Sequence, residues 1–126
     1  MVRPCHVILF LLWFQASLAQ GHFRVLYVFG DAAVNLQTRA QLDSLDKHIR
    51  ECAERDMKII VPGSCKDNPD MYSLFRIMGS EFSVVLVGKD GTEKFRSHHP
   101  VGVTELFRLI DSMPMRQLEM KKKLKE

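Results

Sequence analysis

The stretch FSVVLVGKDGTEKFRS, residues 82–97, decides the fold of this chain. It contains an unbroken apolar run from Val84 to Val87, a turn with Asp90 and Gly91, and a second run in which Phe95 is the large apolar residue. An Asp-Gly pair readily adopts the positive backbone dihedrals of a tight turn, so the two runs are predicted to pair antiparallel. The stretch therefore predicts a β-hairpin.

The two strands of this hairpin differ in polarity. Val84–Val87 shows no polar alternation, which is typical of a strand that is covered on both faces. The second strand carries Glu93, Lys94 and Arg96, and such charges are common on an exposed edge strand, where they discourage association. The first strand is therefore predicted to lie inside the sheet and the second at its edge.

A strand, a helix and another strand are predicted before the hairpin. Phe23–Phe29 is a nearly continuous apolar run and indicates a buried first strand. Leu36–Arg55 is predicted to form one long helix, and Met57–Val61 a further strand. A connection of this kind makes the two strands parallel with a right-handed crossover. The expected inward stripe of the helix is Leu42, Leu45, Ile49 and Cys52.

Two more helices are predicted, one before the hairpin and one after it along the chain. The first begins at Asn68-Pro69-Asp70 and stops at Gly79. The other runs from Val103 to Ser112, and Pro114 breaks or restarts it. The inward residues are expected to be Met71, Leu74, Phe75 and Met78 in the former helix, and Leu106, Leu109, Ile110 and Met113 in the latter.

The predicted order is therefore β-α-β-α-β-β-α. It describes an α/β fold with a mixed four-stranded sheet and helices on both faces, the arrangement of the thioredoxin-like core. Residues 20–114 are assigned to this domain, and residues 115–126 to a basic C-terminal tail.

Residues 1–19 have the pattern of a secretory signal peptide. Arg3 precedes an apolar core from Val7 to Phe14, and the small residues Ser17 and Ala19 stand before the expected cleavage site. This core is far shorter than the roughly 18 to 20 residues that cross a bilayer, and no membrane span is predicted. The mature chain is expected to begin near Gln20 and to be secreted to the extracellular space.

Both hallmarks of thioredoxin chemistry are missing. That chemistry needs a thiolate at the start of the helix after the first strand, where the helix dipole lowers the thiol pKa. Residues 30–35 read GDAAVN and contain no cysteine, and residues 79–81 read GSE where the thioredoxin fold usually places a cis-proline. No catalytic residue is therefore assigned, and the chain is expected not to be an enzyme.

Two cysteines remain in the expected mature chain. Cys52 falls on the predicted inward stripe of the long helix, where a thiol behaves as a small apolar group. Cys65 lies in the loop after the second strand and is expected to be exposed. The intervening strand separates them by roughly 15 Å, so a disulfide would require this loop to fold back sharply. The pair is left either as a disulfide or as free thiols, with Cys65 able to link to another chain.

The other chemical features are two histidines and a lysine cluster. His98 and His99 are adjacent and point to opposite sides of a strand end, so they do not easily share a metal ion, and no metal or other cofactor is predicted. The tail carries four lysines in five positions, which is typical either of solvated terminal charge or of a polyanion site. It holds no interleaved aromatic residue, so no nucleic-acid partner is predicted. The candidate polyanion-binding residues are Lys121, Lys122, Lys123 and Lys125.

Three stretches resemble a known family: residues 53–61 (AERDMKIIV), 84–97 (VVLVGKDGTEKFRS) and 106–120 (LFRLIDSMPMRQLEM). They resemble the domain of unknown function shared by sushi-repeat-containing proteins, Equarin-type extracellular proteins and short bacterial proteins, over about Phe23 to Met120. The resemblance implies a thioredoxin-like or peroxiredoxin-like fold and, among animal members, a role in extracellular matrix, cell adhesion and glycosaminoglycan or receptor contact. It implies no catalytic residue.

The leading hypothesis is a secreted, non-catalytic thioredoxin-like binding module that contacts extracellular matrix, glycosaminoglycan or cell-surface partners, with help from its basic tail. The alternative is an extracellular thiol oxidoreductase or peroxiredoxin-like enzyme that uses Cys65, with Cys52 as a resolving partner. Neither hypothesis assigns an oligomeric state.

Overall fold

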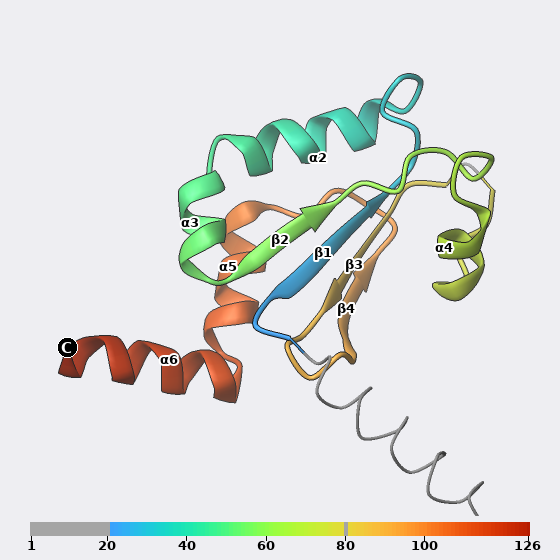
Figure 1. The fold of residues 1–126 in the computed structure, drawn as a ribbon. Helices are drawn as coiled ribbons and strands as arrows, with labels where there is room; N and C mark the ends of the chain where they lie inside the picture. The colour runs from blue at the N-terminus through green and yellow to red at the C-terminus, as the bar shows by residue number, and fades with distance from the viewer. Residues whose placement is uncertain (1–20, 80) are drawn as a thin grey trace, which may run out of the picture.

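The computed structural model describes residues 21–79 and 81–126, so the predicted signal peptide lies outside the described residues. Figure 1 shows one sheet flanked by helices. Its order is β2-β1-β3-β4, with β1 parallel to β2 and antiparallel to β3, and β3 antiparallel to β4. The predicted mixed four-stranded sheet is confirmed. The strands are β1 (Arg24–Phe29), β2 (Met57–Ile60), β3 (Ser83–Val87) and β4 (Glu93–Ser97).

The hairpin forms as its sequence predicts. β3 and β4 pair across a turn in which Gly91 has a φ of 81°, the left-handed conformation that glycine adopts without strain. The Asp90 carboxylate accepts a hydrogen bond from the Thr92 amide at 3.0 Å and closes the turn. β3 lies inside the sheet and β4 at one edge, while β2 forms the other edge.

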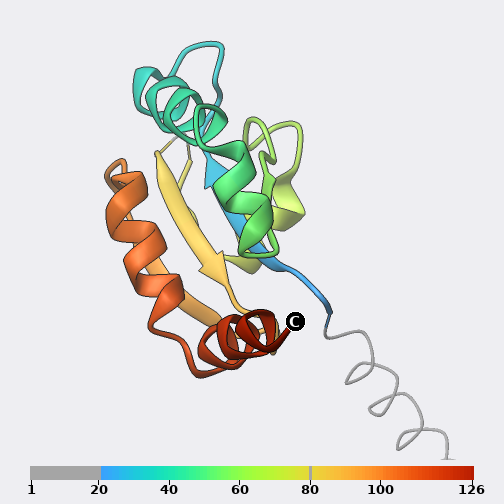
Figure 2. The ribbon, with the colours of Figure 1, turned by 90° about the vertical axis from the view of Figure 1, so that its left-hand side faces the viewer.

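Alternate residues of the central strands enter two separate cores. One core joins Leu26, Val28, Val84 and Leu86 to α2 (Leu36–Asp46), α3 (Ile49–Glu54) and α5 (Val103–Asp111). The other joins Phe29 and Val85 to Tyr72 of α4 (Pro69–Leu74) and to Ile77. Because successive strand residues point to opposite faces, these cores lie on the two sides of the sheet, as Figure 2 shows for α5 and α4.

The prediction of one helix from Leu36 to Arg55 was wrong. The chain forms two helices, α2 and α3, with a break at Lys47 and His48. Leu45 and Cys52 are buried as predicted, but Ile49 is 52% exposed. Since α3 starts anew after the break, the helical stripe does not keep its phase across it, and the inward face of α3 centres on Cys52.

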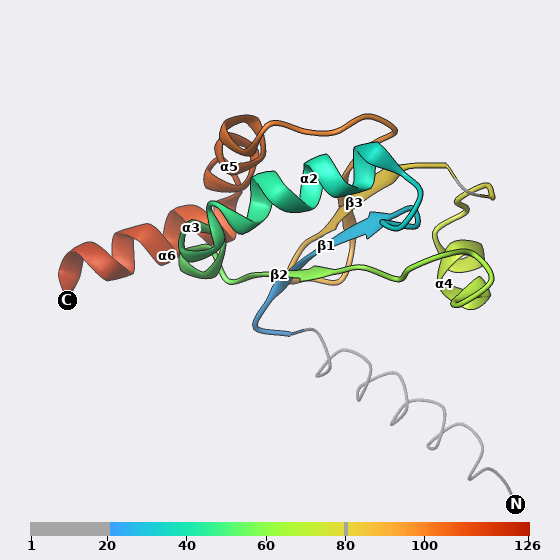
Figure 3. The same ribbon diagram turned by 90° about the horizontal axis from the view of Figure 1, so that it is seen from above.

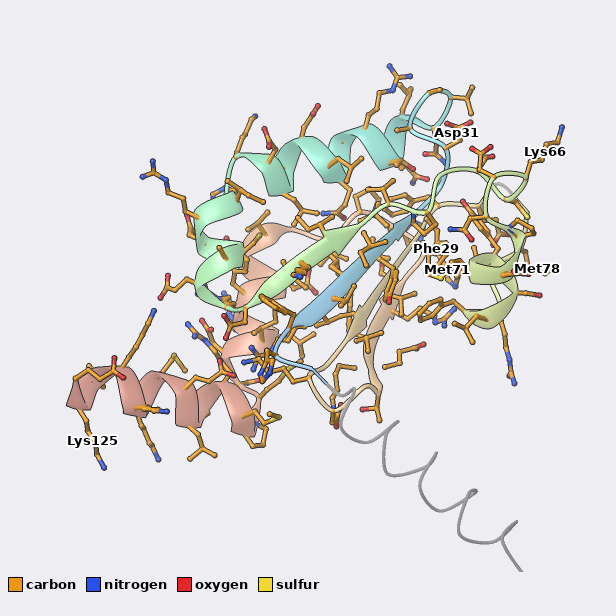
Figure 4. The ribbon with its side chains drawn as sticks, in the orientation of Figure 1. Phe29, Asp31, Lys66, Met71, Met78 and Lys125 are labelled. Carbon is orange, nitrogen blue, oxygen red and sulfur yellow. The ribbon has the colours of Figure 1, made fainter. Side chains whose placement is uncertain are left out.

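The second predicted helix is shorter than expected. α4 ends at Leu74, and the chain turns through Arg76, whose φ is 57°, so Gly79 is not the stop. Leu74 and Met78 are both 72% exposed, in contrast to the prediction. The predicted inward stripe extends to Met78, beyond the end of this six-residue helix, so its four residues do not share one helical face. Tyr72 and Ile77 fill the core instead. Figure 4 shows Met71 near Phe29, and Met78 farther out.

The last predicted helix is confirmed as α5, which buries Leu106 and Ile110, while Leu109 and Met113 pack partly against the same core. A new helix, α6 (Pro114–Lys125), then starts at Pro114. Proline suits the first helical turn, where its missing N–H has no intrahelical partner. Figures 1 and 3 show the carboxyl-terminal turns of α6 extending away from the sheet.

Within residues 21–79 and 81–126, no helix combines the length and apolar character that crossing a membrane requires.

Candidate functional site

The start of α2 is the position where a thioredoxin would carry its reactive thiol. β1 ends at Phe29 and is followed by Gly30, whose φ is 123°, and a side chain at this position would collide with Thr38. Asn35 caps α2: its side-chain oxygen accepts from the amides of Gln37 at 2.9 Å and Thr38 at 3.2 Å. The free amides that would stabilise a thiolate are thus used by a neutral amide side chain.

The loop after β2 reaches this same edge of the sheet. Because β1 and β2 are parallel, their carboxyl ends lie side by side. The Tyr72 hydroxyl joins the two loops, since it accepts a hydrogen bond from the Gly30 amide at 3.0 Å and donates one to the Gly63 carbonyl. Burial raises the pKa of Tyr72, which keeps the hydroxyl protonated. The pair of loops is therefore fixed by a neutral hydrogen-bonding group.

The two cysteines lie on opposite sides of the sheet. Cys65 is partly buried and packs against the core that contains Phe29 and Tyr72. Cys52 is fully buried in the other core, and this burial raises its pKa. Both are free thiols. Cys65 is thus less exposed than expected, and the sheet separates it from Cys52.

His98 and His99 are brought to the same edge by the topology. Together with Asn35, Gln37, Glu81 and Phe82 they line a cavity of about 550 Å³. His98 Nδ1 lies 3.0 Å from the hydroxyl oxygen of the buried Ser83. Among residues 21–79 and 81–126, no group of three or more metal-ligating side chains exists. The sequence interpretation missed this cavity, although the predicted topology places the starts of α2 and β3 and the end of β4 together.

The opposite end of the molecule holds a dense cluster of charges. We call it the ion-pair corner, and it consists of Arg24, Arg55, Asp56, Lys89, Asp111, Arg116 and Glu119. Arg24 is only 1% exposed, and its guanidinium donates to both carboxylate oxygens of Glu119, at 3.1 and 3.3 Å. Lys89 donates to Glu119 at 2.6 Å and to Asp56 at 2.9 Å. These contacts attach α6 to β1 and to the hairpin.

Asp111 makes the second junction of the ion-pair corner. It accepts from Arg55 at 3.0 and 2.9 Å and from Arg116 at 3.0 Å. Burial alone would raise the pKa of Asp111, but these hydrogen bonds lower it below the ordinary value. Burial likewise raises the pKa of Glu119, and the hydrogen bonds from Lys89 and Arg24 lower it. The pKa of Glu119 is therefore also below its ordinary value. Both carboxylates are therefore held in their charged form.

The lysine cluster lies beyond this corner. Lys121, Lys122, Lys123 and Lys125 are exposed, and none of them pairs with a carboxylate of the described residues. Lys121, Lys122 and Lys125 share one face of α6 with Leu118, because the four residues are spaced at i, i+3, i+4 and i+7. Figure 4 shows Lys125 at the far end of the molecule from Asp31 and Lys66.

The mixed sheet and the position of α2 define a thioredoxin-like α/β protein, here without a cysteine at the start of α2. The sequence profile of one family, described as the domain of unknown function DUF4174, matches residues 17–119. The chain belongs to this family. No curated protein sequence matches the chain.

Two solved structures share the fold. Chloroplastic thioredoxin z has a TM-score of 0.61 at 15% identity, over 86% of this chain and 88% of that chain. The structure of a malarial protein has a TM-score of 0.60 at 17% identity, over 71% of this chain and 96% of that chain. At such low identity these likenesses concern the fold alone.

Proposed function

We propose that this protein is a secreted, non-catalytic thioredoxin-like binding module, and that the lysines of α6 bind an anionic glycosaminoglycan of the extracellular matrix or cell surface. The observation that carries the proposal is the cluster of four exposed lysines on the helix that extends from the domain. Their charges are not compensated by carboxylates of the described residues, so they are available to a polyanion. The resemblance to sushi-repeat-containing and Equarin-type extracellular proteins supports the same setting.

The ion-pair corner fixes the position of α6 relative to the rest of the domain. Arg24 and Lys89 pair with Glu119, which lies in the second turn of α6. Arg116 Nη1 also lies 3.7 Å from Glu119 Oε2. The first turns of α6 are thereby attached to the sheet, while the lysines lie in the later turns. A polyanion bound to the lysines would be held at a defined position relative to the domain.

Heparin chromatography tests the proposal. Replacing Lys121, Lys122, Lys123 and Lys125 by Gln should shift elution to clearly lower salt. With fewer lysines, binding releases fewer counterions from heparin and is weaker. The control carries Lys47, Arg50, Lys66 and Arg108, which are exposed elsewhere, replaced by Gln with the same change in net charge. Equal elution of the two variants would show that net charge alone determines retention, and would refute the role of α6.

Secretion is tested with the full chain expressed in a eukaryotic cell. We expect the protein in the medium, with the mass of a chain that begins at Gln20. We expect the same mass with and without reductant. Retention of residues 1–19 in the mature protein would contradict the secretory assignment. A reductant-sensitive doubling of mass would instead show a dimer linked through a cysteine.

The alternative function is a thiol oxidoreductase or peroxide-reducing enzyme that uses Cys65. One observation favours it: Cys65 lies in the loop after β2, whose carboxyl end is beside that of β1, and it packs against the core that contains Phe29. The position of Cys52 on the other side of the sheet weighs against its resolving role. We expect no disulfide-reductase or peroxidase activity; activity that disappears in Cys65→Ser would establish the alternative.

A further inference from the structure

A second candidate binding surface lies on the face of the sheet that α4 covers. An open groove of about 770 Å³ runs between the end of α4 and the β3–β4 hairpin. Tyr27, Phe75 and Val87 supply its apolar floor, and Arg76, Glu93 and Arg96 supply polar groups at its rim. We call it the α4 groove. It contains none of the lysines of α6 and is separate from the proposed glycosaminoglycan site.

The groove is open because α4 is short. Three helices cover the other face of the sheet, whereas α4 covers this face near the end of β1, as Figure 1 shows. Phe29 and Val85 are completely buried there. Tyr27 and Val87 lie farther along the same face and are only partly buried, and Leu74 at the groove is 72% exposed. Apolar side chains in this position favour contact with a further apolar group.

Arg76 has an unusual backbone conformation for its residue type. Its φ of 57° places it in the left-handed region just after α4, at a position that glycine usually occupies. The amides of Arg76 and Ile77 close the helix end by donating to the carbonyls of Ser73 at 3.1 Å and Tyr72 at 2.8 Å. An arginine here is less favourable for the backbone than glycine, so its side chain is the feature to be explained.

The charges at the rim are not balanced. Arg96 donates to Glu93 at 2.7 Å and to the Phe75 carbonyl at 2.7 Å, so its charge is compensated. Arg76 forms no ion pair with a carboxylate of residues 21–79 and 81–126. The groove therefore combines an aromatic and aliphatic floor with one uncompensated guanidinium.

We propose that the α4 groove binds a short acidic segment of a partner protein, with a large apolar side chain against Tyr27 and Phe75 and a neighbouring carboxylate paired with Arg76. A guanidinium recognises a carboxylate through two parallel hydrogen bonds, which gives both charge and geometric complementarity. A second copy of this chain would bring another unpaired Arg76 to such an interface. A highly charged polymer would find one free cation and an apolar floor, so a peptide fits the groove better than either.

The probe is the acetylated and amidated peptide Gly-Asp-Phe-Asp-Gly, titrated into the ¹⁵N-labelled domain and followed by amide chemical shifts. We expect shifts at Arg76, Ile77 and Val87, and about tenfold weaker binding when both Asp residues of the peptide become Asn. Arg76→Gln should weaken binding of the Asp peptide by a similar factor. The Asn peptide should bind Arg76→Gln only slightly more weakly than it binds the wild type, because the change in the protein and the change in the peptide remove the same ion pair.

Arg76→Gly separates binding from folding. Glycine relaxes the left-handed conformation, so this variant should fold at least as well as Arg76→Gln and still lose the affinity for the Asp peptide. The control is Arg50→Gln, which neutralises an exposed arginine of α3 and should bind like the wild type.

Four results would overturn the proposal. The first is equal binding of the Asp and Asn peptides to the wild type, and the second is unchanged affinity of folded Arg76→Gly. The third is an absence of shifts at the groove at millimolar peptide. The fourth is a shift of the groove amides with protein concentration alone, which would show that a second copy of the chain occupies the surface.

Discussion

The two ends of this molecule are held together by different interactions. At the end marked by Asp31 and Lys66 in Figure 4, the loops are joined by neutral groups: the Tyr72 hydroxyl and, nearby, Gln41, whose amide side chain bonds the Val101 backbone at 2.7 and 3.1 Å. At the α6 end, full charges make the junction, and Arg24 is buried beneath them. The two ends of this molecule therefore differ in whether neutral groups or full charges join the packed segments.

This contrast separates two kinds of sensitivity. Neutral hydrogen bonds change little with pH or salt over the ordinary range, whereas paired carboxylates lose their contribution when they are protonated. The attachment of α6 should therefore respond to solution conditions more strongly than the loops at the start of α2. The following three experiments test that difference, from the largest expected effect to the smallest.

The largest effect is expected from Glu119→Gln. The change leaves the buried Arg24 guanidinium without its carboxylate and also removes one partner of Lys89, so the free energy of unfolding should fall by about 3 kcal/mol. Urea unfolding measures it. The control Glu105→Gln changes an exposed glutamate of α5 and should cost less than about 0.5 kcal/mol. Similar losses in the two variants would show that the ion-pair corner contributes little.

A smaller effect is expected from Tyr72→Phe at the other end. Removing the hydroxyl leaves the Gly30 amide and the Gly63 carbonyl without their partner, at a cost of about 2 kcal/mol. The loss should be the same at pH 7 and pH 4.5, because no charge is involved. Tyr27→Phe is the matched control, since the Tyr27 ring packs against Phe75 and Phe29 and its hydroxyl has no hydrogen-bond partner among the described residues. Equal losses for both tyrosines would contradict this role of Tyr72.

The smallest effect is expected from mild acid. The folded-state pKa values of Asp111 and Glu119 lie below their ordinary values of 3.8 and 4.5. Lowered pKa values mean that these carboxylates contribute stability above the ordinary pKa, and that the contribution is lost as the pH falls through the lower, folded-state values. Unfolding free energy should thus decline below about pH 4.5, and the decline should be weaker in Glu119→Gln. An identical pH profile in that variant would exclude Glu119 as a source of the decline.

The sequence was most informative where local rules decide. The Asp90-Gly91 turn, the apolar run of β3 and the charges of β4 predicted the hairpin and the position of its strands, because turn conformation and strand burial depend on neighbouring residues. Helix phase was less predictable. The break at Lys47 and His48 has no glycine or proline to announce it, and the end of α4 uses Arg76 where the sequence rules expect glycine.

By itself, the sequence determined the strands, their order along the chain and the absence of a cysteine at the start of α2, because periodicity and composition are local properties of the chain. Only the tertiary structure decided the pairing of Arg24 with Glu119, which lie 95 positions apart. It also decided the separation of Cys52 from Cys65 by the sheet, and the exposure of Arg76 beside an apolar groove. These features depend on how distant segments dock, and no local pattern specifies which charge a buried arginine will meet.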